Sequence, residues 1–185
     1  MSFDKERIFV WGRLRRYFRW TPIYQYSLQS CDYEYNRDWE LMMPILLRTM
    51  VLDDKYIYIA GPDEVSRQPG VRSAITQADT QKLMLRQDSL LNGQDGSKLL
   101  KVDRKTGKII SGFEMEGMPA FDSMASAYGN LYLSMLDGSL QCFGEGGKPL
   151  PVIATERIEE FNKSAVVPAP APKKKKKKKK KEKKK

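Results

Sequence analysis

Two pairs of acidic residues carry the side chains in this sequence that are best suited to catalysis or metal binding. Asp53 and Asp54 are adjacent, as are Asp63 and Glu64. Neighbouring carboxylates are the residue types of a general acid–base pair or of a set of metal ligands. Both pairs stand where the chain is expected to turn, and aspartate is common in turns because its side chain hydrogen-bonds to the nearby backbone. Turn formation alone therefore explains them.

The sequence has no histidine and two cysteines, Cys31 and Cys142. The lack of histidine excludes His-based catalytic triads, histidine metal ligands and the side-chain switch that usually acts near neutral pH. Two cysteines by themselves make neither a zinc site nor a disulfide framework, and we expect both to be buried thiols. No catalytic constellation or cofactor motif is visible, so the sequence predicts a protein that is not an enzyme and holds no cofactor.

Basic residues gather first at residues 13–19, RLRRYFR, where aromatic side chains are interleaved with arginines. Such a cluster can bind phosphates through its arginines while Tyr17 and Phe18 stack on nucleic-acid bases. It can equally be a solvated connection whose aromatic rings pack on a sheet. Both interpretations remain open at the level of sequence.

The second basic cluster is the lysine run at residues 173–185, which contains twelve lysines and one glutamate. The net charge of these residues is +11, whereas that of the whole chain is +10. The other 172 residues therefore have a net charge of −1. Like charges without apolar side chains cannot support a core, which predicts a disordered tail. The tail either contacts an anionic polymer without reading its sequence or has no selected partner. The lysines that would make such contacts are Lys173, Lys174, Lys175, Lys176, Lys177, Lys178, Lys179, Lys180 and Lys181.

The elements that position these residues are short strands separated by tight turns. Between residues 97 and 144, apolar runs alternate with turn sequences, and residues 131–136 (LYLSML) are dense in side chains that favour strands. Glycine, asparagine and aspartate allow the positive φ of tight hairpin turns. The stretch therefore predicts an antiparallel meander.

Three segments align without gaps: MSFDKERIFVW from Met1, MVLDDKYIYIA from Met50 and MASAYGNLYLS from Met124. Each predicts a short strand, a polar turn and an apolar–aromatic–apolar strand. The second spacing is enlarged by residues 71–91, whose pattern favours a helical or irregular insertion. A repeat of about 50 residues made of short strands is typical of β-propeller blades.

The stretch from Leu100 to Ile110 resembles the repeat of the pyrroloquinoline-quinone (PQQ) type β-propellers, which has an aliphatic–Asp step and a Thr-Gly-Lys turn. Residues 129–144 resemble the other half of the same blade. The blade-turn residues that carry this resemblance are Asp103, Thr106, Gly107, Lys108, Gly129, Asn130, Asp137 and Gly138. In that repeat a tryptophan follows the aliphatic pair and docks between neighbouring blades, whereas this chain has Ser111 there.

The resemblance implies an all-β fold, a partial propeller of about three four-stranded antiparallel blades in residues 1–150. A Pro/Ala-containing linker in residues 151–172 and the disordered tail in residues 173–185 would follow. Because closed propellers usually have 4–8 blades, the missing blades are expected from a longer chain or from other subunits. An open arc would expose strand edges on both sides.

By the same resemblance, the chain is the C-terminal portion of a large bacterial propeller protein. Its expected function is that of a non-catalytic binding or scaffold module for a protein or glycan partner. One alternative is an electrostatic binder that acts through the lysine tail. The other is a fragment of a quinoprotein-like oxidoreductase whose active site lies elsewhere, since the adjacent cysteines, calcium site and catalytic aspartate of those enzymes have no match here.

No signal peptide or membrane-spanning run is visible in the sequence. The resemblance favours a periplasmic or other extracytoplasmic protein if the chain belongs to a longer parent, and a cytoplasmic one otherwise.

Overall fold

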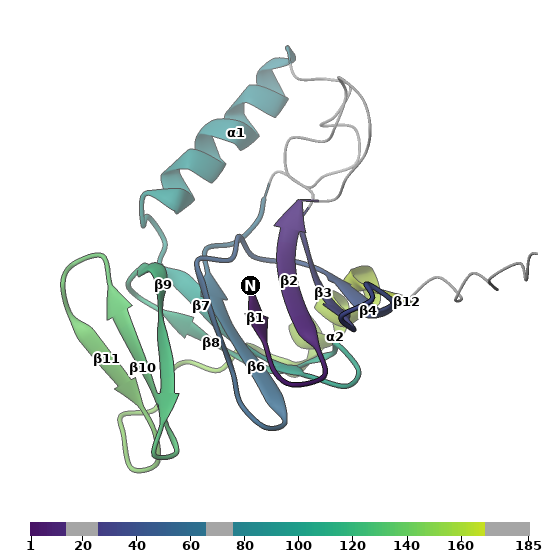
Figure 1. Cartoon of the computed structure of the whole chain (residues 1–185). Coiled ribbons are helices and arrows are strands. Elements are labelled where there is room, and N and C mark those ends of the chain that lie inside the picture. The colour runs from purple at the N-terminus through teal and green to yellow at the C-terminus, as the bar shows by residue number, and fades with distance from the viewer. Residues whose placement is uncertain (14–25, 66–75, 169–185) are drawn as a thin grey trace, which may run out of the picture.

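The computed structural model describes residues 1–13, 26–65 and 76–168 (Figure 1). This part of the chain is mostly β, with three antiparallel sheets and two helices. The predicted predominance of antiparallel sheets is confirmed. One of the two helices lies inside the predicted insertion, and the other lies in the predicted linker. Neither helix in the described ranges is long and apolar enough to cross a membrane.

The sheets follow one another along the chain. The first has the order β1-β2-β3-β4-β12 and is formed by Ser2–Phe3, Ile8–Arg13, Tyr26–Cys31, Arg37–Met42 and Val166–Pro168. The second has the order β5-β6-β7-β8 and is formed by Thr49–Leu52, Tyr56–Gly61, Ser97–Asp103 and Ile109–Met115. The third has the order β11-β10-β9 and is formed by Leu140–Phe143, Asn130–Met135 and Pro119–Ala127. The sequence predicts four strands in each sheet. In the described residues, the first sheet has five strands, the second has four and the third has three.

The three aligned sequence segments fold as the first hairpin of each sheet. All three hairpins have the same register: the second residue of each segment pairs with the ninth. These equivalent pairs are Ser2 with Phe9, Val51 with Tyr58, and Ala125 with Tyr132. A shift of one residue would place every side chain on the opposite face, so the equivalence extends to the direction of the side chains.

The second sheet packs between the other two, and Figure 1 shows the three sheets side by side. One of its faces joins the first sheet in a core of buried side chains that includes Phe9, Leu28, Trp39, Leu41, Ile57, Ile59, Leu100 and Val102. Its other face joins the third sheet in a smaller core with Ala60, Leu99, Met115, Leu131, Leu133 and Met135. Strands apolar on both faces are the physical reason for this layering.

The first strands of successive sheets lie next to each other, since β1 contacts β5 and β5 contacts β9. Hydrogen bonds link the second of these pairs: the Asp122 N–H donates to the Arg48 carbonyl at 3.1 Å, and the Met124 N–H donates to the Thr49 hydroxyl at 2.9 Å. The sheets are therefore joined along the strands that begin them.

Helix α1, Ala78–Leu91, forms the described part of the predicted insertion at residues 71–91. Its buried residues, Thr80, Gln87 and Leu90, lie on one side of the helix. The fully buried Gln87 amide donates to the Asp63 carbonyl and accepts from the Val65 N–H, both at 2.9 Å. These two bonds fix the helix to the end of β6.

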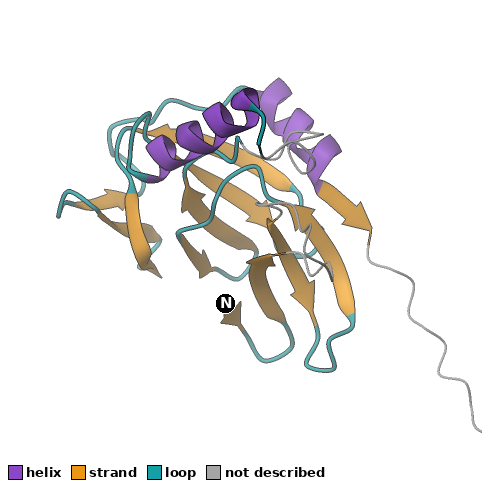
Figure 2. Ribbon diagram, turned by 90° about the horizontal axis from the view of Figure 1, so that it is seen from above, coloured by secondary structure: helices purple, strands orange, loops and turns teal. Residues whose placement is uncertain are grey.

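The segment 151–168, which the sequence places in the linker, packs on the sheets. Val152 bridges to Phe113 at the edge of β8, helix α2 (Thr155–Ala165) follows, and β12 pairs with β4. Ile153, Ile158 and Phe161 are each 6% exposed and belong to the larger core. The outer edges of the first two sheets are therefore covered, and Figure 2 shows α2 leading into the added strand. Residues 169–172 lie outside the described ranges.

Candidate functional site

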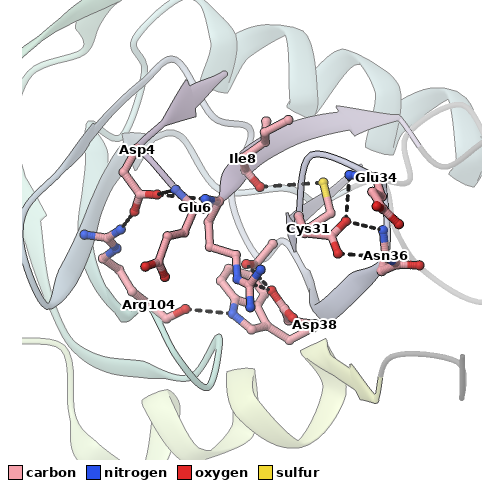
Figure 3. Close-up of polar contacts among 12 residues, drawn as sticks. Asp4, Glu6, Ile8, Cys31, Glu34, Asn36, Asp38 and Arg104 are labelled. Carbon is pink, nitrogen blue, oxygen red and sulfur yellow. Dashed lines mark hydrogen bonds and ion pairs between the residues drawn. The ribbon is translucent and has the colours of Figure 1, made fainter.

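The first interface between sheets is organised around Trp39 of β4, which is 4% exposed. Its indole N–H donates to the Arg104 carbonyl in the β7–β8 turn at 2.8 Å (Figure 3). The indole ring packs closely on Gly107, where the Cβ of any larger residue would lie 2.5 Å from Trp39 Cε3. A tryptophan of the first sheet thus docks on the turn of the second.

The turn that receives Trp39 is built by Asp103. Its carboxylate accepts from the Thr106 N–H at 2.7 Å, the Thr106 hydroxyl at 2.8 Å and the Lys105 N–H at 3.1 Å. Gly107 then has φ +70°, a conformation that glycine adopts without strain. The turn is closed by a hydrogen bond of 2.8 Å, which the Asp103 N–H donates to the Lys108 carbonyl. Four of the predicted blade-turn residues therefore form one receptor.

Arg104 ties this turn to the neighbouring hairpins. Its guanidinium forms an ion pair with Asp4, donates to the carbonyls of Asp53 and Asp54 at 2.7 and 3.1 Å, and lies 5.2 Å above the centre of the Phe9 ring. Its side chain is 18% exposed, so the guanidinium is mostly shielded from solvent. Arg104 therefore connects the two sheets through charge as Trp39 does through its ring.

The acids around this interface are engaged in these structural contacts. Asp38 pairs with Arg7 at 2.9 Å, and Asp4 pairs with Arg104 (Figure 3). Within the described ranges, no group of three or more His, Cys, Asp or Glu side chains is arranged to hold a metal ion. The arrangement can hold the sheets together, and its carboxylates are balanced by nearby cations.

Exchanging Gly107 for alanine tests the docking contact. We expect Gly107→Ala to lower the free energy of unfolding by about 3 kcal/mol, because the new Cβ combines a strained positive φ with overpacking against Trp39. Gly138→Ala is the matched control: φ there is +85°, and no atom lies within 4 Å of the position that the alanine Cβ would take. It should cost about 1 kcal/mol. Urea unfolding of both variants measures the difference, and equal losses would contradict the contact.

The Asp103 turn also predicts a loss of stability in acid. Burial disfavours the charged carboxylate, but the hydrogen bonds from Thr106 and Lys105 outweigh burial and lower the pKa of Asp103. The folded state therefore holds the proton less readily than the unfolded state. The stabilisation is present above the ordinary pKa, about 4, and disappears as pH falls through the lower folded-state value.

We expect Asp103→Asn to be less stable than the wild type near neutral pH and to lose less stability on acidification, because it lacks this titrating group. Urea unfolding at about pH 7 and about pH 3 measures both effects. Asp79→Asn, whose carboxyl is 94% exposed, is the control and should keep the wild-type profile. An Asp103→Asn profile parallel to that of the wild type would contradict the assignment.

The two acid pairs of the sequence lie apart. Asp53 and Asp54 form the β5–β6 turn, as their turn chemistry predicts, and offer backbone carbonyls to Arg104. The Asp63 carboxylate pairs with Lys98 at 2.6 Å, beside Glu64 at the end of β6. The structure does not bring the two pairs together.

The remaining blade-turn residues lie on the third sheet. Gly129 follows Tyr128 in a two-residue turn with positive φ at both positions, and Asn130 begins β10. At the β10–β11 turn the Asp137 carboxylate accepts the Ser139 N–H at 2.8 Å, and Gly138 has φ +85°. These residues form two separate turns, away from the receptor of Trp39.

Two of the sequence predictions lie outside the described residues. They are the basic aromatic cluster, of which residues 14–19 are not described, and the lysine tail with Lys173 to Lys181.

The two cysteines are unpaired thiols with different surroundings. Cys31 is buried, and this burial, followed by the nearby carboxylates of Asp32 and Asp38, raises the pKa of its thiol. Cys142 is exposed on β11, so the expectation that both cysteines are buried is wrong for this residue. It belongs to a third sheet whose outer face has no covering layer among the described residues.

Comparison of the chain with protein-family models, curated proteins and solved structures finds no match. The interpretation of its function therefore rests on the geometry of the sheets and on the turn residues themselves.

Sequence reasoning missed the roles of Trp39 and Asp32. Asp32 has the position in the β3–β4 turn that Asp103 has in the β7–β8 turn, and its carboxylate accepts the Asn36 N–H at 2.8 Å and the Glu34 N–H at 2.9 Å. The spacing from Asp32 to Trp39 is one residue shorter than that from Asp103 to Ser111. The spacing between Asp32 and Trp39 was therefore the sequence signal that could have identified Trp39 as the docking tryptophan.

Proposed function

We propose that this chain contributes consecutive blades to a β-propeller of the PQQ-repeat type and acts as a non-catalytic binding module. The observation that carries the proposal is the docking of Trp39 of one sheet on the Asp103–Gly107 turn of the next. A contact of this kind sets a fixed angle between two successive sheets, as a ring of blades requires.

Two further features support the proposal. The hairpins that begin the three sheets have one common register. Their first strands are also neighbours, in the order β1, β5, β9, and such an order places the first strand of every blade around one axis. Sheets repeated about an axis are the architecture of propellers.

The binding surface in this proposal is the face of the third sheet that points away from the second. Leu140 pairs with Ser134 and Cys142 with Tyr132, and all four side chains lie on that face, opposite the buried Leu131 and Leu133. Leu140 is 67% exposed. In a propeller this face contacts the next blade, so its partner is a further sheet of the same kind, from other subunits or from additional chain.

A second copy of the chain is the simplest source of such sheets, since two copies supply six, which is within the usual 4–8 blades. We expect the full chain to form a dimer at micromolar concentration, measured by light scattering with small-angle scattering for shape. Leu140→Lys should shift the equilibrium to monomer. Leu85→Lys is the control, because Leu85 is 69% exposed on helix α1, away from this face.

If the chain is a monomer, binding of the dye anilinonaphthalene sulfonate measures whether this apolar face is exposed. A monomer that loses dye binding in Leu140→Lys, but not in Leu85→Lys, supports an exposed face that pairs with sheets from elsewhere. A monomer with equal dye binding in all three proteins would contradict the proposal.

A further inference from the structure

A cavity of about 540 Å³ lies at the interface between the second and third sheets. Its volume is within the range of small-molecule sites. Its walls come from the second sheet, from β10 and β11, and from the loop that follows β11. They include the side chains of Tyr58, Leu99, Lys101, Phe113, Leu131 and Lys148.

The register of the sheets explains why a cavity is present here. In the first sheet, Trp39 pairs with Ser30, which pairs with Phe9. In the second sheet, Ser111 pairs with Lys101, which pairs with Tyr58. Phe9 and Tyr58 are equivalent in the repeat, so Ser111 has the position in the second sheet that Trp39 has in the first.

The opposite wall corresponds to the receptor of Trp39. Cys142 pairs with Tyr132 as Lys101 pairs with Tyr58, and the loop after β11 is therefore equivalent to the turn that contains Arg104 and Gly107. Gly144 and residues 147–150 of this loop line the cavity. An indole ring fills this place between the first two sheets. At the second interface the equivalent residue is Ser111, whose cross-strand partner Lys101 lines the cavity.

The walls of the cavity are positively charged. Lys101 and Lys148 line it, and no aspartate or glutamate does. The Lys101 ammonium lies 3.8 Å from the centre of the Tyr56 ring and 5.8 Å from that of Tyr58. Among the described residues it has no carboxylate partner, in contrast to Lys98, which pairs with Asp63 and Glu114.

We propose that this cavity binds a small planar aromatic carboxylate. The ring occupies the place that is equivalent to the Trp39 indole, against Phe113 and Leu131. The carboxylate pairs with the ammonium of Lys101, which lines the cavity together with Tyr58. The proposal depends on the equivalence of the sheets and not on closure of a ring.

Indole-3-acetate is the probe, and indole-3-acetamide is its neutral isostere. We expect the full chain to bind the acid with a dissociation constant on the order of 0.1–1 mM, and the amide about tenfold more weakly. Titration calorimetry measures both. Lys101→Met should reduce the affinity for the acid to that for the amide, while the control Lys105→Met, an exposed lysine on the β7–β8 turn, should change neither.

Ser111→Trp tests the location by filling the cavity from within the chain, and we expect it to reduce binding of both compounds at least tenfold. Chemical-shift changes in the wild type, at Phe113 and Leu131, locate the ring independently of whether that variant folds. The lysine tail is present in every variant, so its charge contributes equally. Absence of binding, unchanged binding in Ser111→Trp, or an acid preference retained in Lys101→Met would each overturn the proposal.

Discussion

Replacing Trp39 with alanine is expected to lower the free energy of unfolding by about 3–5 kcal/mol, the usual cost of removing a large buried aromatic side chain. The change removes a ring that is 4% exposed and belongs to the larger core. It also leaves the Arg104 carbonyl without the indole N–H that it accepts. Urea unfolding followed by circular dichroism measures the loss.

Two further variants separate the contributions to this loss. Trp39→Phe keeps an aromatic ring but removes the hydrogen bond. We expect it to lower the free energy of unfolding by about 1–2 kcal/mol, because the Arg104 carbonyl loses its donor. In a double-mutant cycle, Gly107→Ala should cost about 2 kcal/mol less when residue 39 is alanine, because the new Cβ no longer meets the ring. Additive losses would show that Trp39 does not dock on Gly107.

Ending the chain at residue 150 is expected to have the largest effect of all. It removes Ile153, Ile158 and Phe161, whose burial contributes about 6 kcal/mol at roughly 2 kcal/mol for each side chain. It also removes the backbone partners of β4 and β8. We expect the chain of residues 1–150 to aggregate or to remain unfolded at 25 °C, as measured by light scattering and circular dichroism.

The chain of residues 1–172 is the matched control, because it lacks only the lysine run. It should unfold within about 1 °C of the full chain, since surface changes away from packed features have small effects. Phe161→Ala in the full chain gives a graded version of the same test, with an expected loss of about 3 kcal/mol. A soluble, folded chain of residues 1–150 would show that residues 151–168 are dispensable.

The sequence was informative where structure is local. Hairpin turns at Gly129 and Gly138 follow from glycine at positive φ, and the three aligned segments do form hairpins of one register. The turn around Asp103 was visible for the same reason, because the hydrogen bonds that its carboxylate accepts join residues at most three apart. Local rules predict such features without knowledge of the rest of the chain.

The interfaces between sheets could not be predicted in this way. Trp39 and Arg104 are 65 residues apart, and their contact depends on how two sheets stack. The role of residues 151–168 was missed because its three buried apolar side chains are widely spaced in a charged, proline-containing stretch. Ser111 was recognised as a departure from the resembled repeat, but the cavity that its partner Lys101 lines is formed by two sheets and follows only from the folded structure.

The pairing of β12 with β4 also determines when the first sheet can be finished during synthesis. Val166 pairs with Leu41, so the strand that completes the sheet is made about 125 residues after the one that it joins. At ribosomal rates of about 5–20 residues per second, β4 waits at least several seconds for its neighbour. Contacts of such long range also slow folding. During this interval the newly made chain has an unpaired strand edge, and we expect this edge to be a recognition site for chaperones.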